Sequence, residues 1–390
     1  IGDGVGRRIV THHAFTAKVV VRMNGHDHRD GGAFRNIGQP QGDVHQIRTG
    51  ETGIIFACRQ GDFDKMFLVG KRLKRAVFRQ LSPHGVHGEF HGDAITLTDV
   101  DTNDGTITVD AGGLITATDV VASGGSGDSV TLSTTTGGAV ATLVTGADAV
   151  SITANAGDIT IGSVTATAGT LGVTATAGSI NDAADDNTAD FTAGGLITLT
   201  AQDEVGVLGS GSDLDLEFAA GSSVNVSTTG TGAIDLDGLG ALTLSDVDTV
   251  NGAITASSAG ALTVTDVASG TNGNIVLSTS SGDITGLATV NAGSGNVTLN
   301  SAGAIVDDGS SGTVITGGVL TADAAGAITI DSTVTSANIS TSAAGAVDLD
   351  ETDAITLTDV DTNDGTITVD AGGALTVTDV ASGTNGNIVL

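Results

Sequence analysis

The sequence lacks several residue types on which whole classes of protein depend. Its 390 residues contain one cysteine, two prolines, no tryptophan and no tyrosine. The single cysteine, Cys58, excludes a scaffold of internal disulfide bonds. No apolar run approaches the roughly 18 residues that a membrane-spanning helix needs, so no transmembrane helix is expected.

Basic residues are absent from most of the chain. All 14 Lys and Arg and all 8 His lie before residue 93, whereas residues 93–390 carry 37 of the 45 acidic residues. The net charge is therefore about +6 for residues 1–92 and −37 for residues 93–390, and we treat the two parts as separate domains. The acidic domain repels nucleic acid and anionic lipid, so neither is expected as a partner.

Small aliphatic residues alternate with threonine along the acidic domain. Ile95-Thr96-Leu97-Thr98 and Ile107-Thr108-Val109 are typical segments. A period of two places aliphatic side chains on one face of a strand and threonine on the other, and both residue types favour extended backbone. The pattern therefore predicts ordered β-strands, although most of the 59 glycines also lie in this domain.

Glycines mark a regular repeat. The unit Gly-x-aliphatic-x-aliphatic begins at Gly252, Gly260, Gly273, Gly282 and Gly295, and short steps between these glycines alternate with long ones. A short and a long step together make a period of about 21 residues, with two or three short strands in each. Such spacing is typical of residues at the corners where a coil turns.

Two long segments recur without change. Residues 93–113 are identical to residues 353–373, and residues 260–277 are identical to residues 373–390. We therefore expect an all-β fold, a right-handed parallel β-helix (solenoid) of about 21 residues per coil and roughly 14 coils, filled by stacked Ile, Leu and Val. A β-sandwich is the competing architecture, but its turns do not keep a constant rhythm of short and long steps.

The repeats carry a resemblance to a known group of proteins. Residues 177–206 (AGSINDAADDNTADFTAGGLITLTAQDEVG) and residues 354–390 (AITLTDVDTNDGTITVDAGGALTVTDVASGTNGNIVL) resemble the repeat regions of filamentous-haemagglutinin-like adhesins and related β-strand-repeat surface exoproteins of bacteria. The resemblance covers residues 93–390 only. It implies an extracellular, cell-surface stalk that provides reach, display or adhesion to glycans or proteins of host or neighbouring cells. Such families usually begin with a secretion cap, and residues 1–92 match none.

Catalysis is not expected. The acidic domain has no Lys, Arg or His, and its aromatic residues are Phe191 and Phe218. A nucleophile–histidine pair cannot form without histidine, and β-helical polysaccharide enzymes need a base or a carboxylate pair in a cleft. The main hypothesis is a non-enzymatic stalk; the alternative is a carbohydrate-active β-helix, in which carboxylates with raised pKa values would converge from adjacent coils.

Calcium is the one cofactor that the sequence suggests, at an oxygen-rich turn that occurs twice. The candidate ligands are Asp99, Asp101, Asn103 and Asp104, and their copies Asp359, Asp361, Asn363 and Asp364. Calcium prefers six to eight oxygen ligands. The spacing is close to the start of an EF-hand loop, but Gly105 stands at the seventh position and Asp110 at the twelfth, where an EF-hand has Glu. A solvated turn selected for its backbone geometry is the other interpretation.

Two weaker features concern the surface of the array. A second acidic group, Asp182, Asp185, Asp186 and Asp190, occupies one short segment. Thr-x-Thr pairs such as Thr96/Thr98 and Thr106/Thr108 could order water as ice-binding solenoids do, but consecutive pairs fall on different faces, and threonine is also a good outer residue of any strand.

Residues 1–92 contain no repeat. Apolar residues four apart within the basic segment 67–81 predict an amphipathic helix, which could cap the first coil. His84, His87 and His91 have the spacing of metal ligands, although histidines in a polar loop are more often solvated. A fusion or a shifted reading frame is the other interpretation of this segment. The chain as a whole is expected to be part of a longer protein.

Overall fold

The structure is a computed structural model. It describes residues 94–184, 186–209, 213–219, 221–310, 312 and 314–390 in full, and the backbone of four strands between residues 56 and 90. Every regular element in this part of the chain is a β-strand. Among these described residues, no helix is long and apolar enough to cross a membrane.

The strands are short, and few extend beyond five residues. The first four are β1 (Phe56–Arg59), β2 (Asp62–Val69), β3 (Ala76–Phe78) and β4 (Val86–Phe90). The next fifteen are β5 (Ile95–Asn103), β6 (Ile107–Ala111), β7 (Ile115–Ala117), β8 (Val120–Ser123), β9 (Val130–Thr134), β10 (Ala139–Ala141), β11 (Val144–Gly146), β12 (Val150–Ala154), β13 (Ile159–Ile161), β14 (Val164–Ala166), β15 (Leu171–Ala175), β16 (Ile180–Asp182), β17 (Phe191–Ala193), β18 (Ile197–Ala201) and β19 (Leu214–Phe218). The remainder are β20 (Val224–Thr228), β21 (Ile234–Gly238), β22 (Leu242–Thr249), β23 (Ile254–Ser258), β24 (Leu262–Val264), β25 (Asp266–Ala268), β26 (Ile275–Thr279), β27 (Ile284–Leu287), β28 (Thr289–Asn291), β29 (Val297–Ser301), β30 (Ile305–Asp307), β31 (Ile315–Ala324), β32 (Ile328–Thr341), β33 (Val347–Glu351), β34 (Ile355–Thr362), β35 (Ile367–Ala371), β36 (Leu375–Val377), β37 (Val380–Ser382) and β38 (Ile388–Val389).

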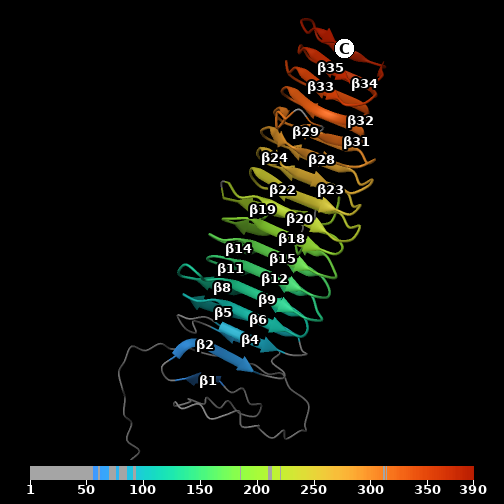
Figure 1. The fold of residues 1–390 in the computed structure, drawn as a ribbon. Helices are drawn as coiled ribbons and strands as arrows, with labels where there is room; N and C mark the ends of the chain where they lie inside the picture. The colour runs from blue at the N-terminus through green and yellow to red at the C-terminus, as the bar shows by residue number, and fades with distance from the viewer. Residues whose placement is uncertain are drawn as a thin grey trace, which may run out of the picture.

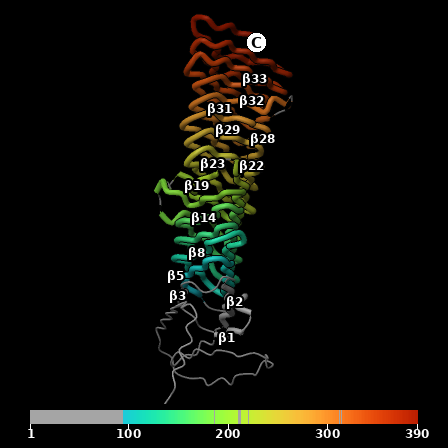
Figure 2. The backbone as a smooth tube through the Cα atoms, turned by 90° about the vertical axis from the view of Figure 1, so that its left-hand side faces the viewer, coloured from blue at the N-terminus to red at the C-terminus, as the bar shows by residue number. Residues whose placement is uncertain are grey.

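The strands stack in parallel to form a β-solenoid, which confirms the expected fold class and coil length. Figure 1 shows the coils rising one above another toward the C-terminus, and Figure 2 shows the same rod from the side. Partners in neighbouring coils commonly lie one period of the sequence repeat apart, as Ile95 and Ile115 do, and Val150 and Leu171. One continuous stack joins fourteen paired strands, namely β5, β8, β11, β14, β17, β19, β21, β23, β26, β29, β31, β32, β34 and β37.

Columns of identical or similar aliphatic side chains fill the interior. In one column Val100, Val120, Val144 and Val164 lie in successive coils, and Phe191 follows them, each with 0% of its surface exposed. Burying a side chain of this size contributes about 1.5–3 kcal/mol before the entropic cost of ordering it. The period-two alternation observed in the sequence therefore corresponds to an interior face and a solvent face, as expected.

Buried hydroxyl groups close one corner of many coils. Thr249 Oγ1 donates to the Gly252 carbonyl at 2.9 Å, and Thr279 Oγ1 donates to the Gly282 carbonyl at 3.0 Å. The same bond recurs from Thr362 to Gly365 at 2.7 Å. A buried carbonyl without a partner is costly, so these residues at the strand ends satisfy the turn that follows.

The predicted helix over residues 67–81 is wrong where the structure describes that segment. Residues 67–69 belong to β2, and Ala76–Phe78 forms β3. β3 pairs in parallel with β5, and β4 pairs with β6. Pairing with the first coil satisfies backbone groups that a helix would have bonded internally, and this tertiary contact outweighs the helical pattern of the sequence.

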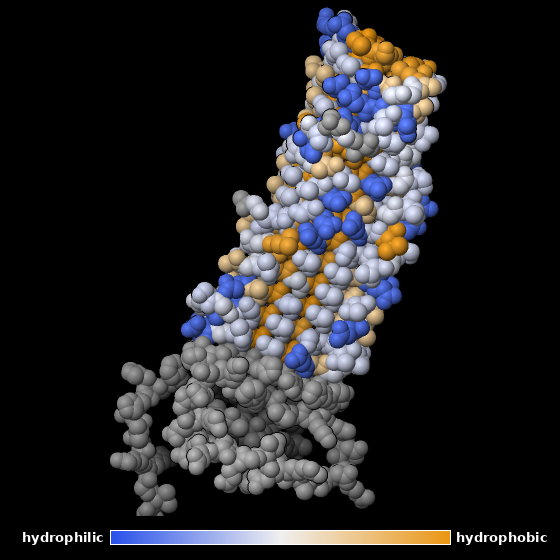
Figure 3. Space-filling model, in the orientation of Figure 1, coloured by the Kyte–Doolittle hydropathy of each residue, from blue (hydrophilic) through white to orange (hydrophobic). Residues whose placement is uncertain are grey.

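The surface of the rod is mostly polar. Figure 3 shows polar and weakly polar residues over most of one face, with narrow apolar stripes along the axis in the N-terminal half. An apolar patch at the C-terminal end coincides with exposed Val377, Ile388, Val389 and Leu390.

Candidate functional site

Three successive coils place an aspartate in the same stack of strands. Asp215 in β19 is the register partner of Asp237 in β21. In the preceding coil, the Asp190 amide donates to the Asp215 carbonyl at 3.0 Å, and the Asp215 amide donates to Asp190 Oδ2 at 3.0 Å. The three acidic residues therefore follow one another at the spacing of neighbouring strands, about 4.8 Å.

Several of these aspartates are buried, which is unusual for ionisable residues without basic partners. Asp190 and Asp215 each expose 2% of their surface, and Asp235, on the same strand as Asp237, exposes 8%. Asp215 lies between Leu214 and Leu216, both fully buried. Because alternate residues of a strand point to opposite faces, the Asp215 side chain is directed away from the aliphatic core yet is still covered.

The coils widen at this point of the rod. Val150, Leu171, Ile197 and Val224 are successive partners in one stack. The step from Val150 to Leu171 is one ordinary period, whereas each of the next two steps is longer by about five residues. The extra residues fall before β17 and before β19. The Gly209 amide, from the segment before β19, donates a hydrogen bond to Asp235.

The five-residue strands of the repeat also move from one stack of the solenoid to another at this point. On the N-terminal side the five-residue strands β9, β12, β15, β18 and β20 form one stack. On the C-terminal side the five-residue strands β23, β26 and β29 continue the stack of the three-residue strands β11, β14 and β17. The acidic residues thus lie where a regular array is interrupted.

Burial dominates the electrostatics of Asp190. Loss of solvation raises the pKa of Asp190 to about 8, the hydrogen bond from the Asp215 amide acts in the opposite direction, and the nearby Asp182 raises the pKa further. At neutral pH this carboxyl therefore retains its proton and shares a hydrogen bond with the Asp182 side chain.

Two further aspartates have raised pKa values for the same main reason. Burial, followed by the charges of Asp213 and Asp237, raises the pKa of Asp215 to about 7. Burial, followed by the charge of Asp213, raises the pKa of Asp235 to about 6, although the Gly209 amide opposes this shift. No basic side chain follows His91 in the sequence, so these charges lack an ion-pair partner along the whole solenoid.

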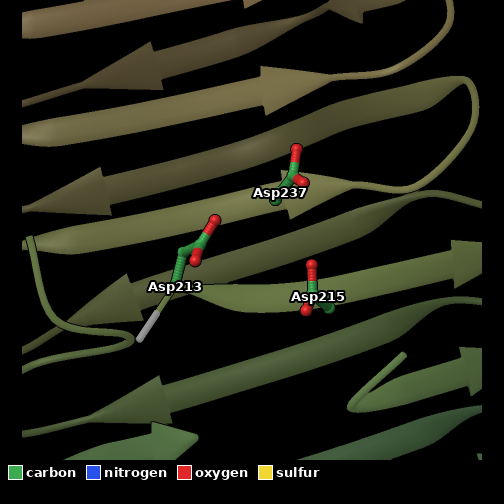
Figure 4. Close-up of side chains that lie close together, drawn as sticks. All are labelled: Asp213, Asp215 and Asp237. Carbon is green, nitrogen blue, oxygen red and sulfur yellow. The ribbon is translucent and has the colours of Figure 1, made fainter. Parts of the chain in front are cut away.

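Three carboxylates lie close together. One oxygen each from Asp213, Asp215 and Asp237 lies within 4.8 Å of the others. Figure 4 shows Asp213 just before β19, Asp215 on that strand and Asp237 on the neighbouring strand β21. Asp237 also accepts a hydrogen bond from the Ser257 hydroxyl of the next coil.

A smaller acidic group lies on another face. Asp246 is the register partner of Asn225, and its neighbour Asp248 has a pKa raised to about 6 by burial and then by the charge of Asp246. Burial and Asp246 likewise raise the pKa of Asp266. The Asn225 side-chain oxygen Oδ1 is buried without a hydrogen bond among the described residues.

The predicted calcium turns lie elsewhere. Asp99, Asp101 and Asn103 lie among the outward-facing residues of β5, and Asp104 follows with a φ angle of 83°. A left-handed backbone is tolerated by Asp better than by most residues. Among the described acidic residues, it is not these but Asp213, Asp215 and Asp237 whose oxygens converge.

The second copy of the turn uses its acid to bind the next coil. Asp364 Oδ1 accepts hydrogen bonds from the Asn385 amide at 3.0 Å and the Thr384 hydroxyl at 3.1 Å, and these bonds lower the pKa of Asp364. Asp359 and Asp361 lie on β34, whereas Asn363 is an exposed residue just beyond that strand. The calcium assignment for either turn remains a prediction.

The side chains of the three predicted histidine ligands lie outside the part of the chain that the structure describes. His84 and His91 lie outside the described residues. His87 belongs to β4, and its side chain is also outside what the structure describes.

The sequence indicated the acidic residues between 182 and 190 but not those of β19 and β21. The sequence groups Asp182, Asp185, Asp186 and Asp190; Asp185 lies outside the described residues, and Asp182 and Asp186 act on the buried carboxyls. Asp215 and Asp237 were missed because they are distant in sequence. The available signal was an acid between aliphatic residues in two consecutive coils, in Leu214-Asp-Leu216 and Ile234-Asp-Leu236-Asp, at positions where threonine is usual.

Known proteins offer no direct comparison: family models, curated proteins and solved structures were each searched, and none matches this chain.

Proposed function

We propose that residues 94–390 form a non-catalytic stalk of a secreted bacterial surface protein, which holds or presents adhesive surface at a distance from the cell. The observation that carries this proposal is the continuous stack of fourteen strands from β5 to β37. At the usual strand spacing this stack is about 60 Å long.

Such a stack suits a mechanical role because each coil is hydrogen-bonded to the next along its strands. The stack continues through the widened coils, where β18 still pairs with β20 from Ile197 to Ala201. The outward residues are mainly Thr, Ser, Asp and Asn, which can bond to glycans or proteins of host or neighbouring cells. The resemblance of the repeats to filamentous-haemagglutinin-like adhesins favours the same role and an extracellular location.

A carbohydrate-active solenoid is the second candidate, because carboxyls with raised pKa values do lie on adjacent coils. Asp190 and Asp215 are the relevant pair. A general acid must reach the glycosidic oxygen within hydrogen-bond distance. Each of these residues exposes only 2% of its surface, so a polysaccharide lying on the rod does not reach them, and the stalk is the better-supported function.

Ice binding is less well supported. Thr96 and Thr116 are register partners on neighbouring coils, but Val140 and Thr160 follow in the same stack. A flat, uninterrupted array of threonine is therefore absent from this face of the described chain.

The verbatim repeats provide a matched test of the stalk. A protein of residues 1–277 ends in the same sequence as the full chain, because residues 260–277 and 373–390 are identical. The two proteins should therefore share the same tip and differ in length by about five coils, or roughly 25 Å. Small-angle scattering should measure that difference.

Beads coated with each protein would then be tested for binding to glycan arrays and to bacterial and animal cells. Lateral adhesion should be stronger for the longer rod, whereas adhesion through the tip should be equal. Absence of the length difference, or release of reducing sugar ends from polysaccharides by either protein, would contradict a non-catalytic stalk.

A further inference from the structure

One stack of the solenoid is reduced to single bridges at the widened coils. β13 pairs with β16 at three residues. The next links in the same stack are the isolated bridges from Ile180 to Val205 and from Val205 to Ile234. Beyond them β21 and β23 pair again at five residues. This stack is therefore thinnest between β16 and β21, where fewer strand hydrogen bonds hold successive coils together.

The same coils carry a buried carboxyl that joins two of them. Asp190, just before β17, exposes 2% of its surface, and its Oδ2 accepts the Asp215 amide of the next coil at 3.0 Å. Burial is the main cause that raises the pKa of Asp190 to about 8, and the charges of Asp182 and Asp215 add to it. Toward β14, residues 162–166 (GSVTA) contain no ionisable side chain. The groups that face Asp190 are therefore acidic or neutral.

Ionisation of Asp190 would place a buried negative charge beside Asp182 and Asp215. Residues 94–390 contain no Lys, Arg or His to balance that charge, and a buried charge without a partner is strongly unfavourable. In a linear array each coil contacts only its neighbours, so stability is close to a sum of local terms. A cost at one interface therefore opens that interface first and leaves the coils on either side stacked.

We propose that the coils of β17 and β19 form a pH-dependent joint in the rod: loss of the Asp190 proton separates these two strands, while the arrays from β5 to β15 and from β23 to β38 stay folded. This inference goes beyond the proposed stalk function and does not depend on it. The joint lies part-way along the rod, between two stacked arrays (Figure 1). In a stalk it would allow a straight rod to bend at one place as pH rises.

Hydrogen exchange of the full 390-residue chain, followed by mass spectrometry from pH 5 to pH 8, tests the joint. Opening releases a proton, so its equilibrium constant should rise about tenfold for each pH unit below the pKa of about 8. After correction for the intrinsic pH dependence of exchange, protection of β17 and β19 should fall at least about 100-fold between pH 5 and pH 7. β9 and β26, in the flanking arrays, should keep their protection. An equal loss in all four strands, or no loss in β17 and β19, would overturn the proposal.

Asp190→Asn assigns the effect to one carboxyl, because asparagine does not ionise and can still accept the Asp215 amide. This variant should lose about 100-fold of the change in protection between pH 5 and pH 7. The matched control is Asp128→Asn, which removes another buried carboxyl: Asp128 is 1% exposed and accepts the Gly125 amide at 2.7 Å. The control should keep the full pH dependence of β17 and β19. An unchanged pH dependence in Asp190→Asn would contradict the joint, as would its loss in Asp128→Asn.

A Glu-specific protease provides a second test that needs no variant. Glutamate occurs three times in residues 94–390, at Glu204, Glu217 and Glu351. Glu217 lies in β19 as the register partner of Thr192 in β17, so cleavage after it requires the two strands to separate. Relative to an unfolded peptide of the same sequence, this cleavage should become about 100-fold faster from pH 5 to pH 7. Glu351, buried in β33, should stay protected, and cleavage there at an equally rising rate would show unfolding of the whole rod and refute the joint.

Discussion

Buried Asp190 should make the metal-free protein less stable as pH rises. The pKa of this carboxyl is about 8 in the folded chain, raised from 3.8 by burial and then by neighbouring acids. Between these two values the folded state holds a proton that the unfolded state has released. The free energy of unfolding that depends on Asp190 is therefore at its highest below about pH 4, and it decreases as pH rises toward 8.

The magnitude follows from proton linkage. One proton held only by the folded state lowers the free energy of unfolding by about 1.4 kcal/mol for each pH unit. Between pH 5 and pH 7, Asp190 alone should therefore cost about 2.7 kcal/mol. Asp215 and Asp235, with pKa values of about 7 and about 6, act in the same direction and steepen the slope below pH 6.

Asp190→Asn isolates this contribution. Asparagine cannot ionise, and its side-chain oxygen can still accept the Asp215 amide that Asp190 Oδ2 accepts at 3.0 Å. The variant should lose about 1.4 kcal/mol per pH unit of the slope between pH 5 and pH 7 and should be the more stable protein at pH 7. Asp203→Asn, at an exposed position of the same region, is the control that should keep the slope.

The assay is urea unfolding in chelator, followed by far-ultraviolet circular dichroism because the chain has no Trp or Tyr. Carbon-13 spectra of labelled aspartate should also contain one carboxyl signal that titrates near pH 8 and is missing from Asp190→Asn. Equal slopes for the two proteins, or stability that increases from pH 5 to pH 7, would refute the reasoning.

Three further predictions concern the corners and the core. Gly270→Ala should destabilise the folded protein by several kcal/mol, because the backbone has a φ of +69° and a Cβ would stand 1.7 Å from the Val250 carbonyl oxygen. The control is Gly172→Ala, where a Cβ meets nothing within 4 Å, and its melting temperature should be close to that of the unchanged protein. Thr279→Val should cost about 1–3 kcal/mol in urea unfolding, since the Gly282 carbonyl loses a donor at 3.0 Å, and an unchanged midpoint would argue against the corner bond. Glu351→Leu should cost about 3 kcal/mol or more, because the buried carboxylate accepts the Ser332 hydroxyl at 2.6 Å and the Val334 amide at 3.1 Å, and faster hydrogen exchange at that amide should report the loss.

Sequence patterns predicted the local structure of this chain better than they predicted which segments pair. Alternation around Ile95 and Ile107 and the spacing of the corner glycines are local properties, and they predicted strands, coil length and a stacked core. The segment 67–81 shows the opposite case: its apolar spacing predicted a helix, but described parts of it pair with neighbouring strands as β2 and β3. A local pattern cannot show which neighbour will satisfy the backbone.

The sequence by itself determined that residues 93–390 are an acidic, repetitive β-solenoid without basic partners, because alternation, repeat length and composition all act within one coil. Only the tertiary structure decided which acids meet. Partners across coils depend on the cumulative length of each turn, and the two long steps that lead to Ile197 and Val224 bring Asp190, Asp215 and Asp237 into one stack. Burial then makes Asp190 and Asp215 different from the many solvated acids on the same rod.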